Sequence, residues 1–221
     1  MAYRWPGQAG FALGVPALAV AAGESVLLLG ESGSGKSTLL SLICGTILPD
    51  SGTVRVAGTD LATLSGGARD RFRAERIGVI FQQFNLLPFG TVADNILLPL
   101  LFAPDRRARA GDAAAAAADL CTALGLPTGV MRSKASTLSV GQQQRVAVTR
   151  ALIGQPPLII ADEPTSALDA NSQAAFLDLL FRQTAAHDTA LLMVSHDPRL
   201  GDRFDRVLRM EDIAQIERAA A

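Results

Sequence analysis

The sequence of 221 residues has few of the features that mark domains held together by metal ions or disulfide bonds. It contains only two cysteines, Cys44 and Cys121, and neither has a CxxC or CxxH neighbour. This argues against a structural zinc site and against a disulfide scaffold. The cysteines are better interpreted as two small apolar residues in a reducing compartment.

An excess of one charge is also missing, because 20 Lys and Arg face 21 Asp and Glu. Long apolar runs are absent too: no segment approaches 18 uninterrupted apolar residues, and no cationic stretch followed by an apolar segment opens the chain. We therefore expect no nucleic-acid partner, no membrane-spanning helix and no export signal, and we predict a soluble, cytoplasmic protein. With 49% hydrophobic and 19% charged residues, the chain can fill a core.

The residues that are present alternate between two kinds of pattern. Short β-rich apolar runs predict buried strands at 25–29, 77–81, 158–161 and 191–195. A helix is expected to open at Lys36, and a hairpin around 53–57 would give an antiparallel β part near the N-terminus. Buried strands separated by helices predict an α/β fold with a mainly parallel sheet.

The middle of the chain has a different composition. Residues 85–153 are rich in alanine and leucine and show no strand pattern, which predicts mostly helix. We therefore expect a single domain, 1–221, in which an α/β core (1–84 and 154–221) carries an inserted helical sub-domain (85–153).

A glycine-rich segment provides the first chemical signal. The pattern GxxxxGK[ST] is matched by Gly30-Glu31-Ser32-Gly33-Ser34-Gly35-Lys36-Ser37-Thr38. It lies between an expected strand and an expected helix, where backbone N–H groups and the helix N-terminus can surround phosphate oxygens. Lys36 would place its charge on the terminal phosphates, and the Ser37 hydroxyl could ligate Mg²⁺. This context disfavours a chance Gly/Ser turn and predicts a nucleoside triphosphate site.

Two acidic residues follow the apolar run at 158–161. Parallel strands deliver their C-terminal ends to the ligand crevice, so Asp162 would lie beside the glycine-rich loop and bind Mg²⁺ directly or through water. Glu163 could polarise a water for in-line attack on the γ-phosphate. The alternative is a solvated acidic pair at the end of a strand.

A histidine closes the last expected strand. His196 follows the run LLMVS, and its imidazole could hydrogen-bond the γ-phosphate or fix the attacking water. A single histidine is more often a structural residue, but its place at the end of a core strand favours the functional interpretation. His187, in a polar stretch, is expected at the surface.

Further motifs carry a resemblance to a known family. The run LSVGQQQR at 138–145 resembles the ABC-transporter signature LSGGQ with the QQR that commonly extends it. The run LIIADEPTSALD resembles the family's Walker B motif, catalytic glutamate and D-loop, while Gln82 matches the Q-loop and His196 the H-loop. Because these motifs occur in the family's order across nearly the whole chain, the sequence is identified as a member of the ABC ATPases.

The resemblance implies a role for each matching residue within one subunit. Phosphates and Mg²⁺ would be held by Lys36, Ser37, Gln82 and Asp162. The general base would be Glu163, and His196 would be the switch residue. The enzyme would hydrolyse ATP with Mg²⁺ as its cofactor.

The resemblance also implies that two chains close head-to-tail around two ATP molecules. Ser139, Gly141 and Gln142 would contact the ATP bound by the opposite subunit. Asp169 would cross the dimer interface near the other site. A helix that starts near Gly141 would present its N-terminus to an anion, so the signature is physically suited to this role.

Two departures from the family pattern affect the expectations. Val140 replaces the first glycine of the signature pair, which predicts a slightly stiffer loop that remains competent. The N-terminus is short, without the strand that family members usually place before the adenine-stacking aromatic. Trp5 is the first choice for that aromatic, and Tyr3 is the alternative.

The segment after Gln82 indicates the type of transporter. Phe84 to Pro99 resembles the pattern FNLLP..TV..N…P of macrolide- and lipoprotein-export ATPases, although import ATPases share much of it. In the family this region forms the groove for a permease, although ordinary helical core is an alternative interpretation. We therefore expect a peripheral subunit bound through a permease to the cytoplasmic face of the membrane, of export or lipoprotein-release type; the alternative is an importer.

Other function classes agree less well with the sequence. A soluble DNA-repair ABC protein would usually carry a long coiled-coil or zinc insertion, and a translation-factor type would need two ABC domains. A P-loop kinase would lack the signature. An inactive scaffold would be expected to lose Glu163 or His196, and both are present.

Overall fold

The computed structural model describes residues 1–5, 11–166 and 168–218. Its strands are β1 (Ala2–Arg4), β2 (Phe11–Gly14), β3 (Ser25–Leu29), β4 (Arg55–Val56), β5 (Thr59–Asp60), β6 (Ile77–Ile80), β7 (Leu158–Asp162), β8 (Ala190–Ser195), β9 (Arg206–Arg209) and β10 (Gln215–Arg218). Its α-helices are α1 (Lys36–Ile43), α2 (Gly66–Arg76), α3 (Val92–Leu97), α4 (Pro104–Ala110), α5 (Ala113–Ala123), α6 (Val140–Leu152), α7 (Ala170–Ala185) and α8 (Met210–Ile213). The 3₁₀ helices are η1 (Leu61–Thr63), η2 (Leu98–Leu101), η3 (Val130–Arg132), η4 (Ala135–Thr137) and η5 (Pro198–Arg203).

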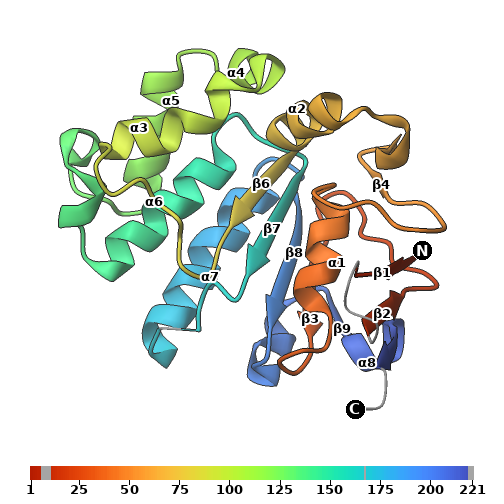
Figure 1. Ribbon diagram of the computed structural model, residues 1–221. Helices are drawn as coiled ribbons and strands as arrows, with labels where there is room; N and C mark the ends of the chain where they lie inside the picture. Colours follow the sequence, from red (N-terminus) through yellow and green to blue (C-terminus); the bar gives the residue numbers. More distant parts are fainter. Residues whose placement is uncertain (6–10, 167, 219–221) are drawn as a thin grey trace.

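A parallel sheet forms the centre of the molecule (Figure 1). Among the described residues it has five strands in the order β6-β7-β8-β3-β9, and all of its neighbouring strands run parallel. The predicted α/β fold is confirmed, and the predicted strands are present as β3, β6, β7 and β8. The edge strand β9 was not predicted, because its sequence RVLR is only half-buried and does not form an apolar run.

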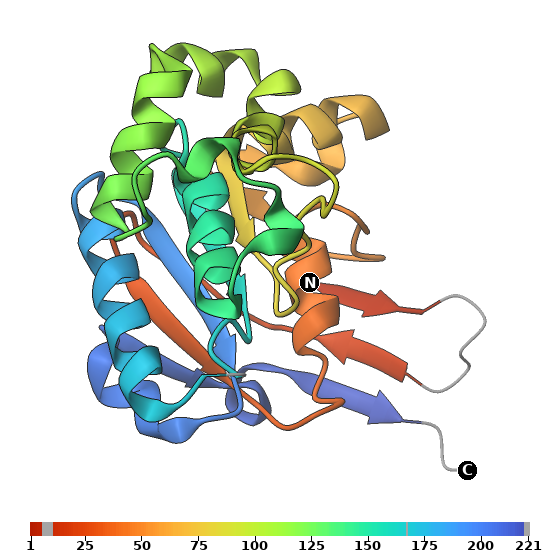
Figure 2. The ribbon, with the colours of Figure 1, turned by 90° about the vertical axis from the view of Figure 1, so that its left-hand side faces the viewer.

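Both faces of this sheet are covered, as expected for a parallel sheet. Successive side chains of a strand point to opposite faces. Val26 and Leu28 therefore pack in a cluster with Leu39 and Leu42 of α1, whereas Leu27 packs in a second cluster with helix α7. Figure 2 shows α1 on one side of the sheet and α7 on the other.

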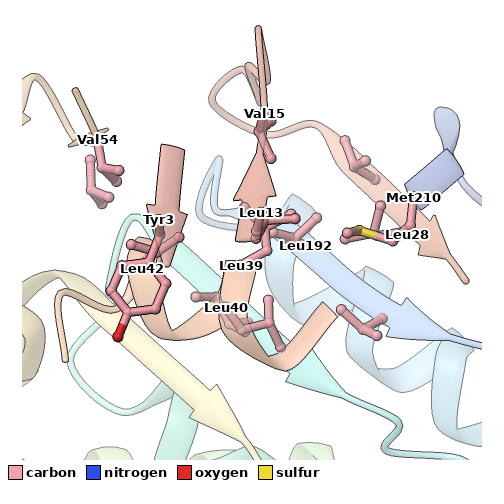
Figure 3. Close-up of a cluster of buried hydrophobic side chains, with 14 of the residues drawn as sticks. Tyr3, Leu13, Val15, Leu28, Leu39, Leu40, Leu42, Val54, Leu192 and Met210 are labelled. Atoms are coloured by element: carbon pink, nitrogen blue, oxygen red, sulfur yellow. The ribbon is translucent and has the colours of Figure 1, made fainter. Parts of the chain in front are cut away.

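A second, antiparallel sheet joins the two ends of the chain in the order β1-β2-β10. Tyr3 and Leu13 from this sheet lie in the same buried cluster as the α1 leucines (Figure 3). The expectation that no strand precedes Trp5 is wrong, because β1 occupies Ala2–Arg4 and pairs with β2. The C-terminal strand β10 was not predicted either, because it exists only through its pairing with β2.

The expected hairpin is present a few residues further along the chain than predicted. β4 and β5 pair antiparallel across Ala57 and Gly58, whose φ angles of 45° and 79° are both positive. Two positive φ angles are typical of the tight turns that match the twist of a two-stranded ribbon.

Helices occupy the middle of the chain, and within the described residues 85–153 there is no strand. Val92, Ile96, Ala117 and Val146 contribute to a core of their own. Helices α3, α4, α5 and α6 lie together beside the central sheet (Figure 1), and on this basis we retain the proposed helical sub-domain. The C-terminal half of α6 packs instead against the central sheet through Val148 and its neighbours. In the described part of the chain, no helix has the length and apolarity needed to cross a bilayer.

Candidate nucleotide-binding site

A pocket of about 530 Å³ lies at the C-terminal ends of the central strands. It is lined by Trp5, Phe11, Ser32, Gly33, Ser34, Gly35, Lys36, Ser37, Thr38, Gln82, Asp162, Glu163 and His196. The glycine-rich loop follows β3, Gln82 follows β6, the two acids come from the end of β7, and His196 follows β8. The parallel topology therefore brings together side chains that are far apart in the sequence.

The glycine-rich loop is shaped by backbone conformations that suit glycine. Gly33 and Gly35 have φ angles of 78° and 85°, which lie in the left-handed region. Gly35 precedes α1, and within the described residues no side chain caps the N-terminus of that helix. The first N–H groups of α1 are therefore directed at the pocket, where an anion would be stabilised by them and by the helix dipole.

Lys36 lies across this loop. Its Nζ donates hydrogen bonds to the carbonyl oxygens of Gly30 and Glu31, at 2.5 and 2.8 Å. The hydroxyl of Ser34 is buried and has no hydrogen-bond partner within the described part of the chain. A phosphate oxygen would satisfy a donor of this kind, so the loop has the chemistry expected of a phosphate site.

The acidic side of the pocket is formed by Asp162 and Glu163. Burial raises the pKa of Asp162, the neighbouring charge of Glu163 raises it further, and Lys36 partly opposes the shift. Glu163 has a positive φ of 48°, and its N–H donates to the Val194 carbonyl at 3.0 Å. One carboxylate of the pair is thus partly desolvated, and the other is held by an uncommon backbone conformation.

His196 contacts the second acid. Its Nδ1 lies 2.6 Å from Oε2 of Glu163, whose side chain is only 14% exposed. Gln82 reaches the same pocket, and its amide donates to the hydroxyl of Ser166 at 3.4 Å. The pocket therefore has a base candidate, a residue that orients it and a polar amide on one side of the glycine-rich loop.

Aromatic residues line the opposite side. The indole N–H of Trp5 donates to the Thr38 hydroxyl at 3.2 Å, which holds the ring beside α1. Tyr3 is 8% exposed and lies in the core, edge-on to Trp5, so the structure places the alternative aromatic away from the pocket. Phe11 lines the pocket as well. Sequence reasoning missed it, because a single phenylalanine in a four-residue strand gives no signal.

Several predicted site residues lie outside this pocket. They are Gly30, Glu31, Ser139, Gly141, Gln142 and Asp169. Asp169 caps α7, and its pKa is lowered mainly by hydrogen bonds from Ser172. Ser139 caps α6 in a reciprocal capping box with Gln142. The expectation that Val140 stiffens a loop is wrong, because residue 140 is the first helical residue of α6 and is 56% exposed.

The donor set is suited to Mg²⁺, which prefers oxygen ligands and is commonly bound by one or two carboxylates together with substrate phosphates. Ser37, Gln82 and Asp162 each bring an oxygen to this pocket. In the described residues no group of three or more His, Cys, Asp or Glu side chains forms a self-sufficient metal site. The residues therefore fit a magnesium ion that arrives with a nucleotide.

A larger groove of about 970 Å³ adjoins the pocket. Ser37 and Asp162 line both hollows. The groove runs between α1, α2 and the residues around η2, and its wall includes two strongly exposed apolar side chains, Leu101 (68%) and Phe102 (64%). Exposed apolar residues of this size on a groove are typical of a protein–protein contact.

The sequence is similar to several known proteins. Residues 15–166 match the family described as ABC transporter. The chain is 44% identical over 195 residues to the lipoprotein-releasing system ATP-binding protein LolD of Anaeromyxobacter dehalogenans, a match that covers 88% of this chain and 80% of that protein. It is 42% identical to the uncharacterized ABC transporter ATP-binding protein YbbA of Escherichia coli K12, over 87% of this chain and 83% of that protein.

Two further comparisons extend this result. The macrolide export ATP-binding/permease protein MacB of Rhodopirellula baltica is 40% identical over 88% of this chain, which spans 28% of MacB. Among solved structures, the dimeric ATP-binding cassette MJ0796 bound to ADP and Pi has a TM-score of 0.75 and 33% identity, and the match covers 92% of this chain and 89% of that one.

Proposed function

The chain belongs to the ABC transporter family, and from this premise we propose that it is the ATP-hydrolysing subunit that drives an export- or lipoprotein-release-type permease. The observation that carries the proposal is the pocket itself, which gathers the glycine-rich loop, Gln82, Asp162, Glu163 and His196 at one edge of the sheet. The lipoprotein-release and macrolide-export relatives favour this function over the importer alternative.

Within one subunit, the residues divide the work between binding and chemistry. The loop amides and Lys36 bind the phosphates of ATP, and Trp5 stacks on its adenine. Glu163 takes a proton from the attacking water, and His196 holds the Glu163 carboxylate and contacts the γ-phosphate. Glu163 lines the pocket and is only 14% exposed, so its carboxylate is largely shielded from bulk solvent.

Magnesium would be held by Asp162, Ser37 and Gln82. When bound, the ion neutralises charge on the β- and γ-phosphates. Asp162 is suited to this role because its partly desolvated carboxylate gains a compensating charge when a cation binds.

The signature residues serve a second chain. Ser139 and Gly141 lie at the N-terminus of α6 and outside the pocket of their own subunit, and the neighbouring Val140 is exposed. In a head-to-tail pair, this helix end would face the γ-phosphate bound by the partner, so that each site is complete only in the dimer. The similar cassette MJ0796 is dimeric in its ADP- and Pi-bound structure, which supports this arrangement.

The groove beside η2 is the proposed permease contact. Leu101 and Phe102 offer apolar surface to an inserted helix, and Ser37 and Asp162 connect the groove to the nucleotide pocket. Attachment through this groove would place the chain on the membrane surface as a peripheral subunit.

Capture of the permease tests this function. The chain would be tagged, given the substitution Glu163→Gln, loaded with ATP and Mg²⁺, and incubated with detergent-solubilised membranes of the source cell. Mass spectrometry should identify a permease with few transmembrane helices and a large extracytoplasmic domain. Phe102→Asp should lower its recovery by about ten-fold, since a charge in the apolar centre of an interface is costly. Ala118→Asp, which adds the same charge at an exposed position of helix α5, is the matched control.

Two outcomes would contradict the proposal in different ways. Recovery of an importer-type permease would leave the ATPase intact but overturn the export assignment. Trapped dimers without any membrane protein would overturn the transport function.

A further inference from the structure

Arg150 connects α6 to the segment that follows Gln82. Its guanidinium donates two hydrogen bonds, to the carbonyl of Phe84 at 2.5 Å and to the carbonyl of Asn85 at 2.8 Å. Arg150 is 8% exposed, and its burial lowers the pKa of the guanidinium. A buried arginine holds these two carbonyls firmly, because leaving its donors unpaired would be costly.

The two carbonyls belong to an unusual turn. Phe84 and Asn85 have φ angles of 60° and 47°, so two consecutive non-glycine residues adopt the left-handed conformation. The turn itself provides short-range bonds, from the Phe84 N–H to Phe81 and from the Asn85 N–H to Gln83. The bonds from Arg150 connect this turn to α6, which is distant in the sequence, and they fix the backbone two residues after Gln82.

The C-terminal end of α6 is fixed in turn by Arg106 of α4. Arg106 is 1% exposed and donates to the carbonyls of Ala151 at 2.7 Å and Ile153 at 2.7 Å. It also donates to Ala74 of α2, which packs beside the central sheet. Arg106 therefore satisfies carbonyls that the end of a helix leaves without partners and holds that end in place.

Because of these contacts, α6 can transmit a displacement from its C-terminal end to its N-terminal end. The helix has 13 residues, and at 1.5 Å per residue it is about 20 Å long. Arg150 lies close to its anchored end, while Ser139 caps its far end. A small displacement of the Phe84–Asn85 turn is therefore transmitted to the signature residues through a rigid element.

We propose that Arg150 is a positioning residue that couples the two halves of the composite ATP site. Arg150 holds the Phe84–Asn85 turn on α6. The position of Gln82 at one nucleotide is therefore coupled to the position of Ser139 at the partner subunit's nucleotide. The proposal rests on the proposed function, because it requires a head-to-tail dimer. Arg150 itself touches neither nucleotide; its effect passes through the turn and the helix.

The test measures ATP-driven dimer formation by analytical ultracentrifugation in the Glu163→Gln background. Arg150→Lys keeps the charge but replaces the planar fork by a point donor, so one of the two carbonyl bonds is lost. ATP affinity of the monomer, followed by the fluorescence of Trp5, should stay within about two-fold, whereas the ATP concentration for half-maximal dimer should rise about ten-fold. In a chain that keeps Glu163 and carries only Arg150→Lys, kcat for ATP hydrolysis should fall by a similar factor with little change in KM.

A matched control and a rescue variant separate coupling from simple folding stability. Arg109→Lys is the control, because Arg109 also donates to two backbone carbonyls, those of Gly154 and Glu75, but not to the turn. Asn85→Gly relieves the left-handed strain, so adding it to Arg150→Lys should restore the Tm while dimerisation stays weak. If Arg150 contributed only to folding stability, the double variant would recover both the Tm and ATP-driven dimerisation, and the proposal would be wrong.

The failure of the two proposals is distinguishable. If the Glu163→Gln chain with Arg150 intact forms no ATP-dependent dimer, the composite site itself is wrong. If it dimerises and Arg150→Lys behaves like Arg109→Lys, the dimer is retained and the coupling role is refuted.

Discussion

Nδ1 of His196 lies 2.6 Å from Oε2 of Glu163, although 33 residues separate them in the sequence. The contact follows from the pairing of β7 with β8, which sets Asp162 beside Val194, and from the Glu163 N–H bond to the Val194 carbonyl. The strand ends therefore position both side chains before any ligand arrives. Such preorganisation lowers the cost of assembling a general base in the reaction.

Replacement of Glu163 by glutamine should remove turnover while sparing nucleotide binding. Glutamine keeps the size of the side chain but cannot accept the proton from water, and a general base contributes about 10²–10⁴-fold to rate. Phosphate release measures the loss, and gel filtration with ATP should show an accumulated dimer. If the variant hydrolyses ATP at the wild-type rate, Glu163 is not the base.

Removal of the Lys36 charge should weaken nucleotide binding. Lys36→Ala leaves the loop without its side-chain cation, and we expect the Kd for ATP to rise at least about ten-fold, because charge-assisted bonds to phosphate are the strong ones. Trp5 is the only tryptophan and lines the pocket, so its fluorescence reports binding directly. Unchanged affinity would contradict the assignment of this loop to phosphates.

Asp162 and Asp169 should respond to neutralisation in opposite directions. The pKa of Asp162 is raised by burial and by Glu163, so its charge destabilises the free protein above the folded-state pKa. Asp162→Asn should therefore raise the Tm at pH 7 in the absence of nucleotide. This gain should shrink as the pH falls through that raised pKa, because the wild-type carboxyl then takes up a proton.

Asp169→Asn is the matched comparison for this effect. Hydrogen bonds from Ser172 and Asn171 lower the pKa of Asp169, so its charge stabilises the fold above the unfolded-state pKa of about 3.9. The contribution is lost as the pH falls through the lower, folded-state value. Asp169→Asn should lower the Tm at pH 7, and thermal scans from pH 3 to 7 distinguish the two signs.

Loss of the Ser139 hydroxyl should suppress turnover without weakening ATP binding by the monomer. Ser139 also caps α6, so Ser139→Ala costs helix stability as well, about 1 kcal/mol. Ser65→Ala provides the control, because Ser65 caps α2 with the same 3.4 Å bond and lies outside the pocket. Equal turnover in the two variants would contradict a role for Ser139 in the partner's site.

The sequence predicted most of the core and much of the pocket, for a physical reason. Buried parallel strands need continuous apolar runs, so β3 and β7 could be predicted. A phosphate loop needs glycines at fixed spacing, so the loop after β3 could be predicted as well. Edge strands β9 and β10 were not, because their stability comes from pairing partners elsewhere in the chain.

The buried arginines could not be predicted from the sequence. Charged residues are seldom fully buried, so Arg106 and Arg150 gave no signal in helical sequence. Their carbonyl partners come from segments up to 66 residues away, which local patterns do not encode. Val140 is a different case, because its helical position follows from the local capping box of Ser139 and Gln142, a pattern that the sequence does carry.

Arg106 should prove to be one of the costliest side chains to remove. Burial lowers its pKa to about 10, yet it stays charged at neutral pH and donates to carbonyls of α2, β6 and the end of α6. Arg106→Met fills similar volume but leaves these carbonyls unpaired, so the free energy of unfolding should fall by on the order of 3 kcal/mol or more. Chemical denaturation measures this loss, and Arg107→Met, at the exposed neighbouring position, should change it by less than about 0.5 kcal/mol. An equal loss of unfolding free energy in the two variants would mean that the contact between α4 and α6 depends on apolar packing rather than on the guanidinium.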